Sequence, residues 1–221
     1  VMVGAILGLC GAALQGLFRN PLADPGIIGV SAGSSLGAAI AIVLFPASLL
    51  TSLFPAGADL AWLSMSNSAI FAFVGGLLTT LLVFRIGQTP FGANVAIMLL
   101  SGVAIGALAF AALGFLQFIA TDSQLRDVTM WQLGSLSGAN HYSLLLCFFA
   151  LLVMLVVLLK QADGLNALLL GESEARHLGI EVEVLKRKLV VACALGVGLS
   201  VAVAGMIGFI GLIVPHICRA L

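Results

Sequence analysis

The apolar residues of the chain fall into six long runs, separated by shorter stretches that hold the charged residues. The runs cover residues 1–18, 27–45, 69–84, 93–120, 142–159 and 189–217. A helix needs about 20 apolar residues to cross the hydrocarbon core of a bilayer. None of the runs contains Asp, Glu, Lys or Arg. The pattern therefore predicts at least six membrane-spanning helices.

The last run is long for one upright helix, and it contains residues that disturb helices near its end. These residues are Gly205, Gly208, Gly211 and Pro215. We therefore expect a break in this run, or a short second helix after it. The depth of Pro215 and His216 depends on how this segment folds.

Composition agrees with a membrane protein. Hydrophobic residues make up 62% of the chain and charged residues only 8%, whereas a soluble domain has about 25% charged residues. Nine basic and nine acidic residues cancel, so no net field attracts nucleic acid. The four cysteines stand singly, without the spacing of a metal site or a disulfide framework.

The basic residues predict the orientation of the chain. Seven of the nine fall in connections on one face, namely Arg19, Arg85, Lys160, Arg176, Lys186, Arg187 and Lys188. The opposite face is expected to hold only Arg126 and Arg219. Because Lys and Arg stay on the cytoplasmic side, the Arg19 face is predicted to lie inside the cell and Val1 outside.

A connection with charged residues and two prolines follows the first run and leads into the second; it reads RNPLADPGIIGVSAGSS at residues 19–35. We call this stretch the knot, without implying a knotted chain. Pro21 and Pro25 are expected to end one helix and begin the next, while Asn20 and Asp24 cap backbone groups of the turn. This interpretation treats the knot as a helix–turn–helix.

The same knot contains a Gly-x-Ser-x-Gly string from Gly29 to Gly33, centred on Ser31. A nucleophile elbow would need a strand-to-helix turn on a sheet, which nothing in the sequence predicts. An intramembrane protease would need only a histidine on a neighbouring helix. The histidines are His141, His177 and His216. The first two fall in connections on opposite faces, and only His216 is expected near membrane depth. A serine flanked by glycines in a membrane helix is more often a packing or hydrogen-bonding residue than a nucleophile, so we interpret Ser31 as a packing residue.

Gln15 lies one turn before the knot, inside an apolar run. A buried amide in a membrane helix is costly unless it bonds to another helix or faces water. Two hypotheses stay open, that Gln15 joins two helices or that it lines a pathway. Small residues spaced four apart, such as Gly4 and Gly8, predict close helix packing in a bundle.

The longest inner connection, residues 165–188, reads LNALLLGESEARHLGIEVEVLKRK. Glu172 and Glu174 favour a helix start, and Gly179 suits its end. Glu172 is expected to pair with Arg176 at i+4.

A helix of two turns is not stable alone in water, so this one must pack on something. Its own bundle is one candidate. A cytoplasmic partner is the other, because Ala175 and Leu178 are expected to form an apolar patch surrounded by charge.

The outer connection at residues 121–142 carries Asp122, Arg126 and Asp127 beside Trp131, which suits a membrane interface. The chain has no Gly-Lys pair and thus no phosphate loop. If ATP is used, another subunit binds it.

Three segments together resemble the permease subunits of the iron-chelate and cobalamin (FecCD-like) ABC importer family. They are LQGLFRNPLADPGIIGVSAGSSLGA, LGESEARHLGI and GMIGFIGLIVPHICRAL. The segment ATDSQLRDVTMWQLGSLSGA is further similar to the haem branch. The resemblance implies an all-α, polytopic bundle of the type II importer permease kind, with residues 1–221 as one permease domain of six to seven membrane helices. Because such permeases have about ten helices, the resemblance identifies the chain as a fragment truncated at both ends.

The resemblance also implies partners and residue roles. The permease would form a homodimer in the bacterial inner membrane, bind two ATPase subunits that carry ATP and Mg, and receive substrate from a periplasmic binding protein. It would bind no cofactor, metal or nucleic acid and catalyse no reaction. The residues implied in ATPase coupling are Gly171, Glu172, Glu174, Ala175, Arg176, Leu178 and Gly179. Those implied in pathway or gate support are Gln15, Asn20, Pro21, Asp24, Pro25, Gly29, Ser31 and Gly33.

Arg126 and Arg219 are candidates for contact with the binding protein, and Pro215 and His216 match the family motif without an assigned role. A secondary transporter is the main rival, but it would place ionisable groups inside the membrane runs. Haem, a ferric siderophore and cobalamin all stay open as the substrate, with haem preferred.

Overall fold

The computed structural model describes residues 1–46, 60–90 and 92–220, with side chains for all of these except 60–66. The elements in chain order are α1 (Met2–Phe18), η1 (Pro25–Ile28), α2 (Val30–Leu44), α4 (Leu60–Ile86), β1 (Gln88–Thr89), β2 (Gly92–Ala93), α5 (Val95–Ile119), α6 (Asp122–Leu133), α7 (His141–Lys160), α8 (Ala162–Leu170), α9 (Glu172–His177), α10 (Val182–Ala204) and α11 (Ile210–Ala220). The strands form an antiparallel hairpin in which Gln88 pairs with Ala93. The described chain is thus a helical bundle with one small hairpin.

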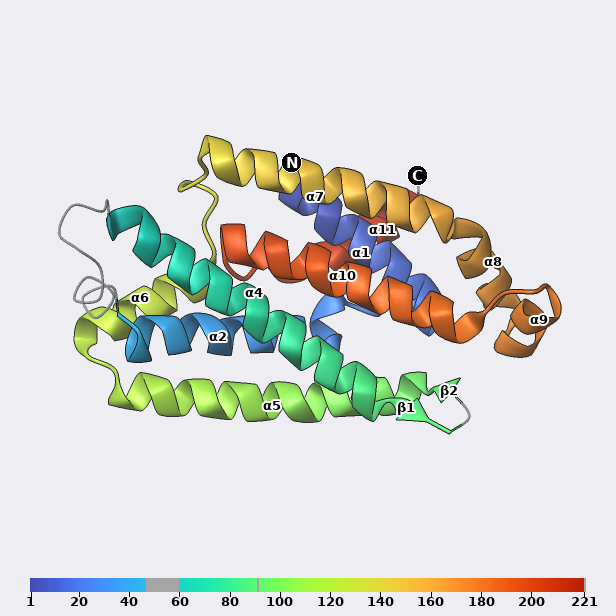
Figure 1. The fold of residues 1–221 in the computed structure, drawn as a ribbon, viewed down its shortest axis with the longest axis horizontal. Coiled ribbons are helices and arrows are strands. Elements are labelled where there is room, and N and C mark those ends of the chain that lie inside the picture. Colours follow the sequence, from blue (N-terminus) through green and yellow to red (C-terminus); the bar gives the residue numbers. More distant parts are fainter. Residues whose placement is uncertain (47–59, 91, 221) are drawn as a thin grey trace.

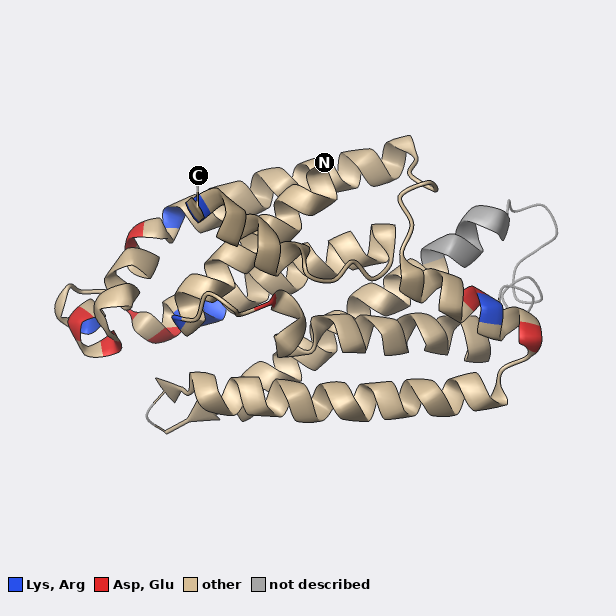
Figure 2. Ribbon diagram, turned by 180° about the vertical axis from the view of Figure 1, so that it is seen from behind, with Lys and Arg blue, Asp and Glu red and all other residues tan. Residues whose placement is uncertain are grey.

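The long helices run along the long axis of the molecule, and the polar connections lie at its two ends (Figure 1). One end carries α8, α9 and the β1–β2 hairpin, and we call it the α9 end. The opposite end carries α6, and we call it the α6 end. Most charged residues gather at the α9 end and a smaller group at the α6 end, with an almost uncharged middle (Figure 2). This distribution is typical of a bundle whose middle lies in a bilayer.

Four described helices are long and apolar enough to cross a membrane, and three shorter apolar helices accompany them. The long ones are Asn67–Ile86 within α4, then α5, α7 and α10, and the shorter ones are α1, α2 and α11. The outer faces of α5 and α7 expose large apolar side chains, among them Leu100, Phe118 and Leu159. Such faces suit contact with lipid or with other apolar helices.

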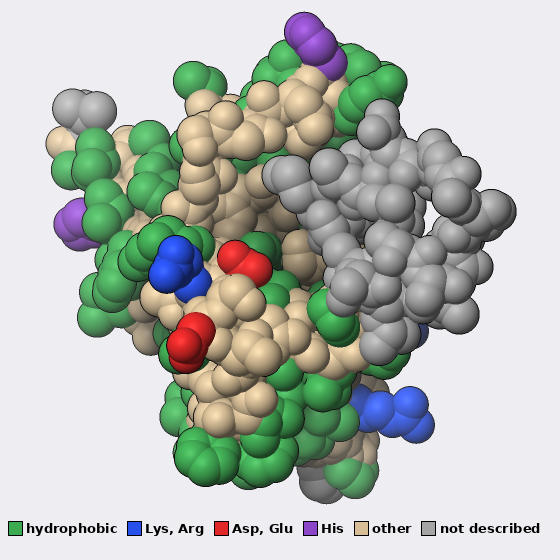
Figure 3. Space-filling view, turned by 90° about the vertical axis from the view of Figure 1, so that its left-hand side faces the viewer, with side chains coloured by type: hydrophobic (Ala, Val, Ile, Leu, Met, Phe, Trp, Pro, Cys, Tyr) green, Lys and Arg blue, Asp and Glu red, His purple; other side chains and the backbone are tan. Residues whose placement is uncertain are grey.

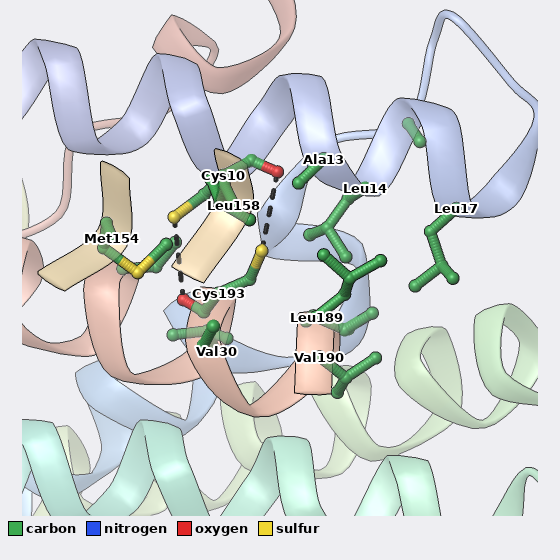
Figure 4. Packing of buried hydrophobic residues seen from close by; sticks show 14 of the residues in the cluster. Cys10, Ala13, Leu14, Leu17, Val30, Met154, Leu158, Leu189, Val190 and Cys193 are labelled. Atoms are coloured by element: carbon green, nitrogen blue, oxygen red, sulfur yellow. Dashed lines mark hydrogen bonds between the residues drawn. The ribbon is translucent and has the colours of Figure 1, made fainter. Parts of the chain in front are cut away.

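The core is centred on α1, which buries Ile6, Cys10 and Leu14 completely. A helix that is apolar on all sides is typical of a protein core or a membrane span, and α7, α10 and α11 pack around this one. The Cys10 Sγ donates to the carbonyl of Cys193 on α10, and the Cys193 Sγ donates to that of Cys10 (Figure 4). Both thiols are free and serve to pack α1 on α10.

Close packing through small residues is confirmed between α2 and α4. A Cβ added at Gly33 would collide with the carbonyl of Gly75, and one at Gly37 with the carbonyl of Phe71. Backbone therefore meets backbone along this contact, as expected where lipid gives helices no hydrophobic reason to associate. Gly4, in contrast, has open space around it.

The predicted break in the last apolar run is confirmed. Helix α10 ends at Ala204, Gly205 has a φ of 71°, and α11 begins at Ile210 with Pro215 inside it. The second run was placed too early, because η1 occupies Pro25–Ile28 and α2 begins only at Val30, after Gly29 with a φ of 84°. The inner connection also ends before Lys188, since α10 begins at Val182.

Candidate functional site

The connection between α7 and α10 forms α8 and α9, which project at the α9 end (Figure 1). The predicted start at Glu172 and end near Gly179 are confirmed. Gly179 has a φ of 83°, a conformation that favours glycine. Its N–H donates to the Arg176 carbonyl, and the next N–H, that of Ile180, donates to the Ala175 carbonyl. The chain thus leaves α9 through a tight, hydrogen-bonded turn.

The apolar patch on this segment differs from the expected one. Ala175 is completely buried against the rest of the chain, whereas Leu178 is 64% exposed. Leu169 and Leu170, at the end of α8, are also exposed. The projecting surface therefore presents Leu169, Leu170 and Leu178, and Ala175 is the point at which α9 packs on its own bundle. Packing on its own bundle is thus observed at Ala175, and docking on a cytoplasmic partner stays a prediction for the exposed leucines.

The predicted pair of Glu172 with Arg176 is wrong. Glu172 Oε1 lies 2.8 Å from the Nζ of Lys186, while an Arg176 Nη lies 3.8 Å from Glu183 Oε1. Lys186 is 1% exposed, and a buried cation requires a matched anion far more than the exposed Arg176 does. The tertiary partner therefore displaces the local i+4 partner.

Lys186 also binds the hairpin that leads into α5. Its Nζ donates to the carbonyl of Ala93 at 2.6 Å and lies 3.7 Å from Glu183 Oε1. The N–H of Ala93 donates to Glu183 Oε2 at 2.7 Å. One cluster thus joins α9, α10 and the hairpin: Lys186 and Ala93 are buried in it, and Glu172 and Glu183 are partly exposed.

Sequence reasoning did not single out Lys186 as a site residue. A usable signal exists, because Val182, Leu185 and Leu189 are buried at helical spacing, and Lys186 falls on the same face. A lysine on the apolar face of a helix is rarely buried unless it is paired. Glu183, three residues before it, is the nearest candidate partner.

The knot between α1 and α2 folds as predicted at its caps. The Asn20 side chain accepts from the N–H of Leu22, and the Asp24 side chain accepts from that of Gly26 at 2.7 Å. Pro25 is buried at the first position of η1, while Pro21 is exposed. Both capping predictions are confirmed, and the knot is a turn held by side-chain hydrogen bonds.

Ser31 lies in the first turn of α2 and is partly buried. Within the part of the chain that the structure describes, no hydrogen bond joins Ser31 to a histidine. His141 begins α7, His177 ends α9, and His216 is exposed on α11. These positions are spread over separate elements, and Ser31 sits where the α2 helix starts beside the knot.

Gln15 joins α1 to α11, which favours the first of its two hypotheses. Its side chain is 3% exposed, its Nε2 donates to the Leu212 carbonyl at 3.4 Å, and its Oε1 accepts from Arg219 at 2.7 Å. The expected outer position of Arg219 is wrong, because α11 runs back and brings Arg219 to the part of α1 just before Arg19. Pro215 is buried beside this contact and His216 is exposed.

The α6 end carries a compact group of acidic and basic side chains, with hydrophobic and other uncharged atoms next to it (Figure 3). Asp122, Arg126 and Asp127 are exposed on α6. The helix starts with a capping box between Thr121 and Gln124. The Gln124 Nε2 also donates to the carbonyls of Ile42 and Val43 at the end of α2. Arg126 therefore sits on a helix that is fixed to the bundle.

Comparison with known proteins gives a consistent result. A model of the FecCD transport family matches residues 1–221. The chain is 41% identical over 219 residues to the hemin transport system permease protein HmuU of Yersinia pestis, a match that covers 99% of this chain and 62% of that protein. It is 39% identical over 219 residues to the vitamin B12 import system permease protein BtuC of Klebsiella pneumoniae, covering 99% and 61%.

One solved structure, an inward-facing conformation of a transporter assigned to the metal-chelate type of ABC transporters, also matches. Its sequence is 32% identical and the TM-score is 0.84. The match covers 100% of this chain and 65% of that one. The chain therefore spans less than two thirds of the length of these relatives.

Proposed function

The chain belongs to the FecCD transport family, and from this membership we propose that it is the permease subunit of a bacterial ABC importer. The importer would pass an iron chelate across the inner membrane, driven by ATP hydrolysis on a separate subunit. The whole-chain family match carries this proposal. The permease would act without chemistry on its substrate, by switching a pathway between two openings.

Haem is the preferred substrate, because the hemin permease of Yersinia pestis is 41% identical to the chain. The vitamin B12 permease of Klebsiella pneumoniae follows at 39%. These two sequence identities differ little, so the test of the proposal includes a ferric siderophore and cobalamin beside haem.

The α9 end is proposed to face the cytoplasm. The placement of Arg219 beside Gln15 adds an eighth basic residue to the seven already assigned to this end, which leaves Arg126 at the other. The distribution of Lys and Arg supports this orientation. Two ATPase subunits carrying ATP and Mg would bind here, and a periplasmic binding protein would contact Arg126 at the α6 end.

The docking surface for the ATPase is proposed to be the projecting face of α8 and α9. Its centre is Leu178, with Glu174, Arg176 and the glycines of the two turns around it. An exposed apolar side chain rimmed by charge is typical of an element that inserts into a groove of a partner. The buried side of the same helix, at Ala175, would pass the movement to the bundle. The capped turn with Asn20, Pro21, Asp24 and Pro25 would support the moving helices, together with the close packing at Gly33. A second copy of the permease would complete the pathway.

The experiment uses the full-length permease in liposomes with its ATPase and binding protein, and follows ATP-dependent uptake of haem. Leu178→Asp places a charge on the apolar centre of the surface and is expected to abolish uptake with folding retained. Leu178→Met keeps the apolar surface and is the matched control. Uptake unaffected by Leu178→Asp would refute the docking surface. Transport of a siderophore or cobalamin without haem would retain the importer and replace the substrate, and no ATP-dependent chelate transport would refute the proposed function.

A further inference from the structure

The cluster around the buried Lys186 connects segments that are far apart in the sequence. Glu172 comes from α9, Lys186 and Glu183 come from α10, and Ala93 closes the hairpin just before α5. Within the cluster, the Lys186 Nζ lies 2.8 Å from Glu172 Oε1 and donates to the Ala93 carbonyl at 2.6 Å. Its ammonium group is thus shared between the projecting helix and the hairpin.

The hairpin backbone is held on both sides of Ala93. Lys186 binds its carbonyl, and Glu183 accepts from its N–H at 2.7 Å. A Cβ added at Gly92 would collide with the Glu183 carboxylate, so the glycine permits this close approach. Charge-assisted hydrogen bonds are shorter and stronger than neutral ones. Ala93 is therefore tied more firmly to α9 and α10 than ordinary apolar packing would achieve.

Helix α5 begins two residues after Ala93, with Asn94 as its N-cap. Along its length α5 packs mainly on η1, α2 and α4, through buried side chains such as Leu113. The cluster is where the start of α5 is joined to α9 and α10. A displacement of α9 that keeps the Glu172–Lys186 pair intact must carry Ala93, and with it the start of α5.

We propose that Lys186 is a positioning residue that transmits movement of α9 to α5 through Glu172 and the Ala93 carbonyl. This inference rests on the proposed function, because the movement comes from the ATPase docked on α9. Without the ammonium group, α9 can still bind the ATPase through Leu178 but no longer holds the hairpin. ATP hydrolysis then continues while substrate movement is lost.

The test uses the full-length permease with its ATPase and binding protein in liposomes, and measures ATP hydrolysis and haem uptake on the same preparation. Lys186→Met keeps the length of the side chain and removes its charge. Lys186→Arg keeps the positive charge and supplies N–H donors for the same two acceptors. Lys188→Met removes a charge from an exposed position two residues further along α10 and is the matched control.

We expect Lys186→Met to lower the number of haem molecules transported per ATP by roughly 5- to 150-fold, the range of a typical coupling free energy. Lys186→Arg should restore most of this ratio, and Lys188→Met should leave it unchanged. Glu172→Gln should lower the ratio in the wild-type background and add little to Lys186→Met, since both remove the same link.

Three results would overturn the inference. An unchanged ratio in Lys186→Met would show that the cluster transmits nothing. A parallel fall of hydrolysis and uptake, with a lower thermal stability and no rescue by Lys186→Arg, would show a purely structural role. Wild-type protein without ATP-dependent chelate uptake would refute the proposed function itself, and the wild-type sample distinguishes this failure from the first two.

Discussion

The contact between α1 and α11 gives the sharpest test of the packing, because two glycines meet there. A Cβ added at Gly11 would lie 2.5 Å from the carbonyl carbon of Gly211 and 2.8 Å from its Cα, and closer still to its oxygen. Ordinary van der Waals contact begins at 3.4 Å. All three obstacles are backbone atoms, so no side chain can turn aside. The substitution Gly11→Ala must therefore push α11 away from α1.

The cost of this displacement follows from what the contact holds. Overpacking a closely packed core costs about 1–3 kcal/mol. Two hydrogen bonds of Gln15 cross the same contact, to Leu212 and from Arg219, and such bonds between membrane helices average about 0.6 kcal/mol each. Together these effects predict a loss of about 2–4 kcal/mol.

Gly4→Ala is the matched control, because it lies on the same helix and a Cβ there meets nothing within 4 Å. Both variants gain the same helix propensity, about 1 kcal/mol, so their difference isolates the packing term. Thermal unfolding in detergent should place Gly11→Ala below Gly4→Ala by about 4–16 °C, at 2–4 °C per kcal/mol for a chain of this size. Equal melting temperatures would refute the close contact of α1 with α11.

Two further predictions test neighbouring features. Gln15→Leu removes both bonds to α11 but no packing volume, so its melting temperature should fall less than that of Gly11→Ala, and a larger fall would contradict the assignment of Gln15 as a simple link between helices. Gly33→Leu forces the α4 backbone away from α2 and should lower the melting temperature by the equivalent of about 1–3 kcal/mol or more. Gly114→Leu on α5 is the control and should have little effect in the same assay, because a Cβ there meets nothing within 4 Å. Equal effects of the two substitutions would argue against the α2–α4 contact.

The features that the sequence predicted correctly are those governed by neighbours along the chain. The caps at Asn20 and Asp24 depend on backbone groups two residues away. The end of α9 depends on the positive φ of Gly179, and the break after α10 depends on Gly205. Local geometry decides each of them, so the residue type alone is informative.

The features that it missed depend on segments far apart in the sequence. Glu172 satisfies the spacing rule for a pair with Arg176, yet it binds Lys186, because the packing of α9 on α10 buries the lysine. Arg219 follows an apolar run, and only the return of α11 brings it to Gln15. The helix α6 could have been recognised, since Thr121 and Gln124 match a capping box.

Helix α5 links the two ends of the molecule to which separate partners are assigned in the proposed function. At the α9 end it follows Ala93, which Lys186 and Glu183 hold. At the α6 end it leads into α6, where Gln124 is bonded to the carbonyls that close α2. A helix of 25 residues spans about 37 Å at 1.5 Å per residue, which is enough to cross the bilayer core. Under the proposed function, a displacement of α5 therefore moves residues both at the ATPase surface and beside Arg126. Coupling between two binding sites is reciprocal. Binding of the periplasmic protein at α6 must therefore change the affinity of α9 for the ATPase by a certain factor, and docking of the ATPase must change the affinity of α6 for the periplasmic protein by the same factor.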